Sequence, residues 1–270
     1  MSSARAPSVL AVFLLLGAPA AAPALAATGS IQEVVDCALR NLPPSAHGVA
    51  KLVTRASDGS EKAVEVDYWS HQPDLGARQI VIARRAASSG EVAAYLFSDG
   101  DAIGEAWAYA KGQAKAQRIT TRGVEVRLFG SAVSLEDFAR FARVAFPGKV
   151  RRLDDAEIGG RKVYVVETTP GPDSGSEYAR IVTSIDREWC AILRRESFDP
   201  SFQNGSRPRK TYSVEPADVR VDGKFANARR ARLEDAKDGS STQMEVLALE
   251  LPAAVDDTFF SPDALPRASR

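Results

Sequence analysis

Short segments in which apolar and polar residues alternate, separated by tight turns, run from residue 49 to residue 251. In one of them Val64, Val66 and Tyr68 fall on one face, with acidic residues between them. A period of two is that of a β-strand, because successive side chains point to opposite faces. The sequence Ser-Asp-Gly at 57–59 joins two such segments in the manner of a hairpin. Roughly ten or eleven strands of this kind, without an internal repeat, predict a mainly β (α+β) protein with one strongly curved antiparallel sheet.

Three further segments carry specific expectations. The apolar run at 124–129 is expected to form a strand before a helix, and 225–234 is expected to form one continuous strand. Pro252 ends the last strand, because proline cannot donate to a strand ladder. The tail that follows is expected to leave Phe259 and Phe260 exposed.

An N-terminal helix is predicted at Ile31–Arg40. Ser30 precedes it as a candidate N-cap, and Glu33 stands three residues later, which is the spacing of a capping box. The Pro-Pro sequence at 43–44 ends the helix.

A second, short amphipathic helix is predicted at Ser134–Arg143. Ser134 is a good N-cap, and Asp137 completes a capping box in place of the usual Glu. Phe138 and Phe141, with the alanine that follows, lie on one stripe. Strands precede and follow this helix, so we expect it to lie against the sheet.

The first 26 residues have the parts of a secretory signal. Arg5 supplies a positive charge, residues 9–16 form a short apolar run, and Ala24-Leu25-Ala26 offers small residues for cleavage. The apolar run is shorter than the roughly 18 residues expected of a membrane-spanning helix. We therefore expect cleavage near Ala26, export to the periplasm, and one domain formed by residues 27–270.

The charge of the chain excludes one class of partner. Its 35 basic residues balance 35 acidic residues, and removal of the signal with its single arginine leaves a net charge of −1. Nucleic acid is therefore not an expected partner, because binding it needs a basic face.

The two cysteines, Cys37 and Cys190, leave two alternatives open. In an oxidising compartment an even number of cysteines permits a disulfide. Two buried thiols that behave as small apolar residues are the other interpretation. Separation in the sequence does not give the Cα distance, so it does not decide between them.

Residues suited to enzyme chemistry are scarce. The chain has two histidines, and we interpret His47, beside a proline turn, and His71, at a strand end, as solvated side chains. The sequence around Ser174 lacks the spacing of a nucleophile elbow. There is no phosphate loop, dinucleotide fingerprint or calcium loop. We therefore expect no enzyme activity, catalytic residue, metal or cofactor.

Aromatic residues in and around 107–143 are the remaining candidates for function, although many of them are expected to fill a core. A curved sheet covered by only two or three short helices does not close on itself. Its concave side is then an apolar cavity that can hold a ligand.

Several short motifs occur in an order found in a known family. They are Trp107-Ala108-Tyr109, Arg118-Ile119, Gly130 to Phe138, Val163 to Pro170, Tyr178 to Val182 with Ile185-Asp186, and Arg195 to Asp199. Through them the chain resembles the LolA-like outer-membrane lipoprotein-sorting proteins, over roughly residues 45–265. It departs from the family pattern at Lys111, where the family has proline, and at Val133, where the family has an aromatic residue. The family's Trp-Val-Pro entry to a late strand is also missing around 225–232.

The resemblance implies an unclosed β-barrel, with short helices as a lid over a hydrophobic cavity and no catalytic residues. It implies a periplasmic carrier that shields acyl chains of lipids or lipoproteins during transfer toward the outer membrane. An inner-membrane transporter and an outer-membrane acceptor would be its partners. The expected cavity and lid residues are Phe97, Trp107, Tyr109, Phe129, Phe138, Phe141 and Ile181.

The alternative is a non-enzymatic envelope module that docks on a membrane transporter or an outer-membrane assembly. Such a module would have a filled core and no ligand-sized cavity. Its partner patch would include Phe259 and Phe260, together with the arginine pairs that recur beside the strands.

Overall fold

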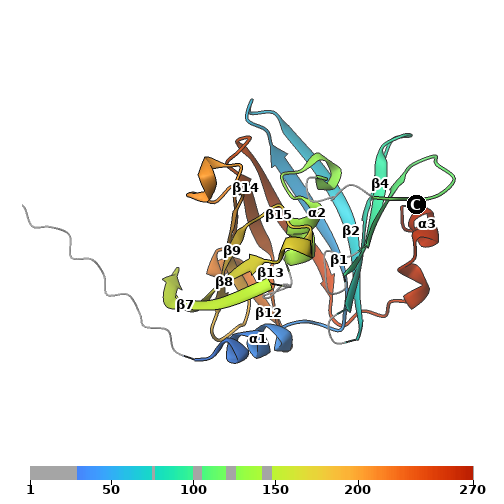
Figure 1. Ribbon diagram of the computed structural model, residues 1–270. Helices are drawn as coiled ribbons and strands as arrows, with labels where there is room; N and C mark the ends of the chain where they lie inside the picture. Colours follow the sequence, from blue (N-terminus) through green and yellow to red (C-terminus); the bar gives the residue numbers. More distant parts are fainter. Residues whose placement is uncertain (1–28, 75–76, 100–104, 120–125, 142–147, 270) are drawn as a thin grey trace, which may run out of the picture.

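Strands dominate the computed structural model, and its helices are short (Figure 1). The structure describes residues 29–74, 77–99, 105–119, 126–141 and 148–269, so the expected signal lies outside the described residues. The first ten strands are β1 (Ser45–Arg55), β2 (Glu61–Asp74), β3 (Ala77–Arg84), β4 (Val92–Asp99), β5 (Glu105–Ala110), β6 (Gln117–Arg118), β7 (Gly148–Ile158), β8 (Arg161–Pro170), β9 (Arg180–Asp186) and β10 (Ile192–Phe198). The last five are β11 (Lys210–Ser213), β12 (Val219–Asp222), β13 (Phe225–Ala228), β14 (Arg230–Asp235) and β15 (Ser240–Glu250).

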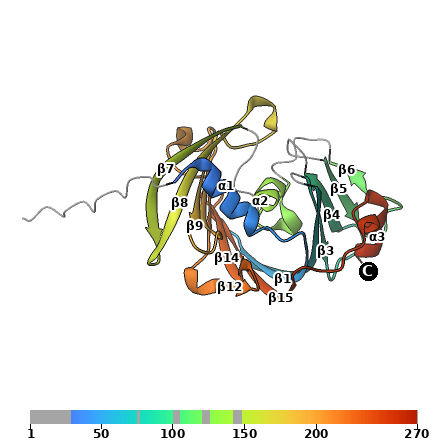
Figure 2. The same ribbon diagram turned by 90° about the horizontal axis from the view of Figure 1, so that it is seen from below.

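Thirteen of these strands form one antiparallel sheet in the order β6-β5-β4-β3-β2-β1-β15-β14-β11-β10-β9-β8-β7. Seen end-on, the sheet curves around the middle of the molecule and stays open between its two edges (Figure 2). Shifts in register, for example between Val49 and Ala50 in β1 and between Leu153 and Ala156 in β7, mark bulges or irregularities in the ladders. Bulges bend strands and increase their twist, which favours this curvature. The predicted fold class, an unclosed and strongly curved sheet, is confirmed.

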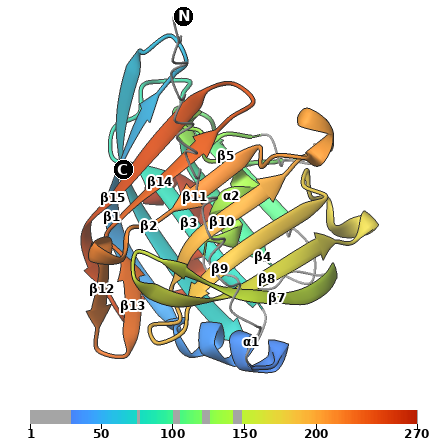
Figure 3. The same cartoon turned by 90° about the vertical axis from the view of Figure 1, so that its left-hand side faces the viewer.

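β12 and β13 form a separate hairpin beside the large sheet (Figure 3). The expected continuous strand at 225–234 is therefore wrong, because it divides at Arg229 into β13 and β14. The backbone N–H of Arg229 donates to the carbonyl of Asp218 (2.7 Å), which holds the end of β13 to the hairpin. Beyond this point β14 pairs with β11 and β15 instead.

The helices are α1 (Ile31–Arg40), α2 (Leu135–Arg140) and α3 (Leu265–Ala268). The 3-10 turns are η2 (Leu128–Gly130), η3 (Pro172–Ser174), η4 (Gln203–Gly205), η5 (Pro216–Asp218), η6 (Asp257–Phe259) and η7 (Pro262–Ala264).

Both predicted capping boxes are present. The Ser30 hydroxyl accepts from the N–H of Glu33, and the Ser134 hydroxyl accepts from the N–H of Asp137. The expected last residues of the second helix lie outside the described residues. The strand expected at 124–129 is wrong at its end, because Leu128 and Phe129 form η2, while residues 124–125 lie outside the described residues.

Apolar side chains are buried on both faces of the sheet. The concave face of β1–β4 carries one core, which includes Val66, Ile82 and Phe97, and α2 lies inside this curve (Figure 2). The outer face of β3–β5 carries a second core, covered by the C-terminal segment with α3. Phe260 is only 6% exposed in this second core. The expectation that Phe259 and Phe260 form an exposed pair is wrong, because the tail folds back onto the sheet.

A disulfide joins Cys37 of α1 to Cys190, which lies between β9 and β10, with a Cα–Cα distance of 5.2 Å. Val34 of α1 also packs against Val166 and Ile185 of the sheet. α1 is thereby fixed across one end of the open barrel (Figure 1). In the part of the chain that the structure describes, no helix has the length and apolar character needed to cross a membrane.

We expect loss of this disulfide to lower the free energy of unfolding by about 2–4 kcal/mol, because the link closes a long loop in the unfolded chain. The variant with both Cys37→Ala and Cys190→Ala, compared with wild type by urea denaturation, measures the loss. Wild type under reducing conditions should match the variant. Equal stability of oxidised wild type and variant would contradict a stabilising role for the link.

Candidate ligand-binding cavity

An apolar cavity of about 250 Å³ lies between the concave face of the sheet and α2. Its walls come from β1, β2, β3, β11, β13, β14 and β15, and α2 contributes Phe138, with Phe141 at the end of the helix. The strand residues that line it are Ala50, Leu52, Val66, Tyr68, Ser70, Ile80, Ile82, Tyr212, Asn227, Ala228, Ala231, Met244 and Val246. These positions recur every second residue along β1, β2 and β3, as one face of a strand requires.

A second cavity of about 170 Å³ continues from the first toward α1. Five of the described residues line both cavities: Tyr68, Phe141, Tyr212, Asn227 and Ala228. The second cavity is bounded by the end of α1 and by the disulfide, and its lining is more polar than that of the first. Apolar space and hydrogen-bonding groups therefore meet at the junction of the two cavities.

Tyr68 reaches the junction because Gly48 leaves room for it. The two residues are directly opposite in the β1–β2 ladder. A Cβ atom built on Gly48 would lie 2.3 Å from the Tyr68 ring, much closer than van der Waals contact. The absence of a side chain at position 48 thus allows the ring to lie over β1.

α2 presents aromatic rings toward the cavity. The rings of Phe138 and Phe97 lie 5.7 Å apart, and those of Phe141 and Tyr212 lie 4.8 Å apart. This short amphipathic helix thereby forms one side of the cavity.

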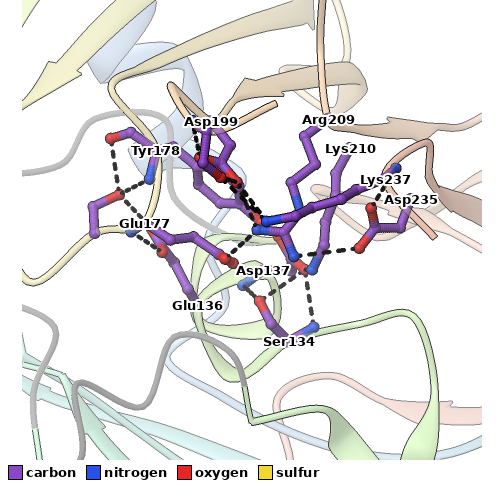
Figure 4. Close-up of polar contacts among 12 residues, drawn as sticks. Ser134, Glu136, Asp137, Glu177, Tyr178, Asp199, Arg209, Lys210, Asp235 and Lys237 are labelled. Carbon is purple, nitrogen blue, oxygen red and sulfur yellow. Dashed lines mark hydrogen bonds and ion pairs between the residues drawn. The ribbon is translucent and has the colours of Figure 1, made fainter. Parts of the chain in front are cut away.

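The opposite side of α2 faces a buried network of charges (Figure 4). Asp137 accepts from Lys210 Nζ at 2.6 Å and from Tyr178 Oη at 2.8 Å. Glu136 accepts from Arg140 Nε at 2.7 Å and from the N–H of Glu177 at 3.0 Å. These bonds connect α2 to β11 and to the loop before β9.

The network extends deeper into the second half of the sheet. Arg209 Nη1 donates to Glu177 at 2.6 Å and to Asp199 at 3.0 Å. Arg195 of β10 donates to the carbonyl of Arg140 and, at 3.2 Å, to the Thr183 hydroxyl. α2 is therefore held by charges on one side and by aromatic contacts on the other.

Burial and pairing shift the pKa values of the network in opposite directions. Burial alone would raise the pKa of Asp137, but the Lys210 ammonium and the hydrogen bonds hold it below the ordinary value of 3.8. Burial raises the pKa of Glu136 above its ordinary value, despite the attraction of Arg140. Burial, together with the charge of Arg140, lowers the pKa of Arg195 to about 9. Asp137 and Arg195 are thus expected to be charged at neutral pH.

The structure brings some of the expected site residues together. Phe138 and Phe141 line the cavity, while Phe97 and Phe129 lie in the concave-face core beside it. Ile181 is 1% exposed on β9 and lines neither of the two cavities.

Trp107 and Tyr109 lie elsewhere, on the outer face of the sheet. They are paired across the ladder with Leu96 and Ala94, and all four belong to the core covered by the C-terminal segment. The residues of β5 that pack against the concave-face core are Ala106 and Ala108, which alternate with Trp107 and Tyr109. The interpretation of Trp107 and Tyr109 as cavity residues is therefore corrected.

Sequence reasoning did not identify Tyr212, Met244 or the Asp137–Lys210 pair as parts of the site. The alternation that placed Val64, Val66 and Tyr68 on one face was the available signal for the β2 wall. No group of three or more His, Cys, Asp or Glu residues suited to a metal occurs among the described residues.

A family model described as "-like: Uncharacterized protein" matches residues 77–267, and the chain belongs to this family. Among curated proteins, no significant match is found.

The fold matches that of an outer membrane lipoprotein-sorting protein domain from Vibrio parahaemolyticus (TM-score 0.75, 17% identity, covering 87% of this chain and 97% of that one). A DUF1329 family protein from Desulfovibrio piger has the same TM-score of 0.75, with 17% identity and coverage of 88% and 100%. A LolA superfamily protein from Nitrosomonas europaea has a TM-score of 0.65, with 20% identity and coverage of 87% and 99%. The resemblance stated from the sequence is confirmed: the chain has a LolA-like fold, in divergent form.

We expect Gly48→Ala to destabilise the protein by about 1–3 kcal/mol, because the added methyl group overpacks the site and displaces Tyr68. Gly171→Ala is the matched control, since a Cβ there meets no atom within 4 Å. Urea denaturation of both variants measures the effect. Equal stabilities would show that Tyr68 does not depend on the close approach.

We expect Asp137→Asn to cost about 3–5 kcal/mol of unfolding free energy at neutral pH, because it leaves the Lys210 charge buried without its partner. The pKa of Asp137 is lowered in the folded protein, so its carboxylate stabilises the fold above the ordinary value of 3.8. This contribution is lost as the pH falls through the lower folded-state pKa.

The measurement is urea denaturation of wild type and Asp137→Asn from pH 7 to pH 3. The difference between them should stay constant down to about pH 4 and then shrink, since protonation neutralises Asp137 in wild type. The double variant Asp137→Asn with Lys210→Met is the control and should recover part of the loss. A difference that does not depend on pH would contradict the ion pair.

Proposed function

We propose that this protein is a periplasmic carrier that holds an acyl chain of a lipid or lipoprotein and shields it from water during transfer toward the outer membrane. The observation that carries the proposal is the apolar cavity of about 250 Å³ between α2 and the concave face of the sheet. The lipoprotein-sorting description of a protein with the same fold supports it.

The energetics suit a carrier. Each acyl methylene removed from water contributes about 0.8 kcal/mol, so burial of part of a chain is enough for useful affinity. The cavity is slightly smaller than the roughly 300 Å³ at which small-molecule sites begin. A long acyl chain therefore requires α2 to move away from the sheet.

The proposed route begins with export. The signal-like residues 1–26 and the disulfide both suit a protein that works in an oxidising compartment. An inner-membrane transporter would deliver the cargo, and an outer-membrane acceptor would receive it. The carrier itself would make and break no covalent bond.

The alternative, a docking module with a filled core, has less support. It predicts no ligand-sized cavity and an exposed patch at Phe259 and Phe260. The core is not filled, because an apolar cavity of about 250 Å³ remains beside α2, and Phe260 is buried against the outer face of the sheet.

The first test is mass spectrometry of organic extracts from protein purified out of the periplasm. We expect an acylated lipid in stoichiometric amount. We also expect it to be lost in Phe138→Asp, because the charge would be buried beside the cavity. Ala50→Phe, which fills the cavity without adding charge, should lose the lipid too.

Leu247→Asp is the matched control. It adds the same charge as Phe138→Asp, but at a residue that is 49% exposed on the outer surface. It should retain the lipid and the thermal stability of wild type. An empty wild-type protein that also fails to take up an acyl fluorophore would refute the carrier proposal.

A further inference from the structure

The junction of the two cavities contains polar side chains but no charged ones. Among the described residues that line either cavity, none is Asp, Glu, Lys, Arg or His. The polar side chains shared by both cavities are Tyr68, Tyr212 and Asn227. A ligand group at this junction would therefore meet hydrogen-bonding groups without a countercharge in the wall.

The hydroxyl of Tyr212 is the polar group at this junction that is available to a ligand. Its ring contacts Phe141, and within the described residues the hydroxyl makes no hydrogen bond, in contrast to that of Tyr178, which donates to Asp137. Tyr212 is partly buried, and its hydroxyl is not one of the buried polar atoms that lack a partner, so it is accessible from the cavity. In the free protein, water in the cavity can satisfy it, and in a complex an atom of the ligand can.

Tyr212 acts as a donor at neutral pH. Burial raises its pKa to about 12, even though the neighbouring Arg195 charge lowers it. The phenol thus keeps its proton and can donate it to an acceptor oxygen.

The other polar groups of the second cavity are largely occupied. The Asn41 side chain accepts from the N–H of Ala226 at 2.6 Å and donates to the carbonyl of Ala226 at 2.9 Å. Asn227 makes one long bond, from Nδ2 to the Phe225 carbonyl at 3.4 Å. Asn41 therefore holds the hairpin in place, and Asn227 remains able to contact a ligand beside Tyr212.

We propose that the junction is a subsite for an uncharged acyl carbonyl, in which Tyr212 donates a hydrogen bond to the carbonyl oxygen of an ester or amide. The hydrocarbon chain would lie in the apolar cavity, and the group attached to the carbonyl would lie in the second cavity, toward α1. This inference rests on the proposed carrier function and names its ligand class: acyl esters and amides, rather than free fatty acids.

The described residues that line the two cavities include no charged side chain, which favours esters and amides over free fatty acids. A free carboxylate taken out of water needs a paired charge or several donors. Arg195, whose charge acts on Tyr212, already donates to the Arg140 carbonyl and to Thr183, and it lines neither of the two cavities. An ester or amide carbonyl needs only one or two donors, which the junction offers.

The test is displacement of an apolar fluorophore from the full mature protein by three probes of matched chain length: methyl laurate, dodecane and laurate. Wild type should bind methyl laurate more tightly than laurate. Tyr212→Phe should weaken methyl laurate binding about fivefold, the effect of one net hydrogen bond, and leave dodecane binding unchanged. Tyr164→Phe is the matched control, because Tyr164 packs near α1 and lines neither of the two cavities.

The outcomes distinguish failure of the carbonyl subsite from failure of the carrier function. If Tyr212→Phe changes ester and alkane binding equally, or changes neither, the carbonyl subsite is refuted while the carrier proposal stands. Tighter binding of laurate than of methyl laurate would refute the uncharged ligand class. If wild type binds neither the fluorophore nor any probe, the carrier function fails, and the subsite fails with it. Thermal unfolding of each variant identifies any loss that comes from misfolding.

Discussion

The curvature of the thirteen-stranded sheet is the constraint on which the other features depend. A strongly curved sheet brings its concave side chains toward one another but leaves more space than they can fill. α2 lies in this space, and two aromatic residues of the α2 segment occupy part of it. What remains is a cavity lined by β1, β2, β3, β11, β13, β14 and β15, bounded on the other side by the helix. The site is thus a consequence of the sheet's shape rather than of a local motif.

The charges beneath α2 determine where the helix lies. Buried ion pairs often stabilise a fold no more than apolar residues of similar size would, because desolvation offsets their attraction. They do discriminate between positions, since a displaced charge loses its partner at high cost. With Asp137 paired to Lys210 of β11 and the Arg140 carbonyl bonded to Arg195 of β10, α2 has one favourable position against β9–β11. The aromatic contacts on its other side have no such directional requirement.

Local patterns were enough to predict the elements but not their neighbours. The capping box of α2 is confirmed because Ser134 and Asp137 are three residues apart and interact directly. The face on which Trp107 lies depends on the register between β4 and β5, and a slip of one residue reverses every side chain. The sequence offered no way to choose, so the outer face was missed. The partner of Asp137 is Lys210, 73 residues away, and no local signal connects them.

The two sides of α2 differ in whether a bound ligand could replace the contacts that the helix makes there. The wall formed by β3–β5 is covered on its outer face by the C-terminal segment, so bending it would expose a second core to water. The end of the barrel is fixed by α1 and the disulfide. Extra space for a chain must therefore come from α2. An acyl chain can replace the lost contacts of Phe138 with apolar contacts of its own, because such contacts are non-directional. It cannot replace the charged contacts of α2 with Lys210 and Arg195. We therefore expect the helix to separate first from the wall formed by β1–β4 while it stays attached to β9–β11, which opens the cavity without breaking the charge network.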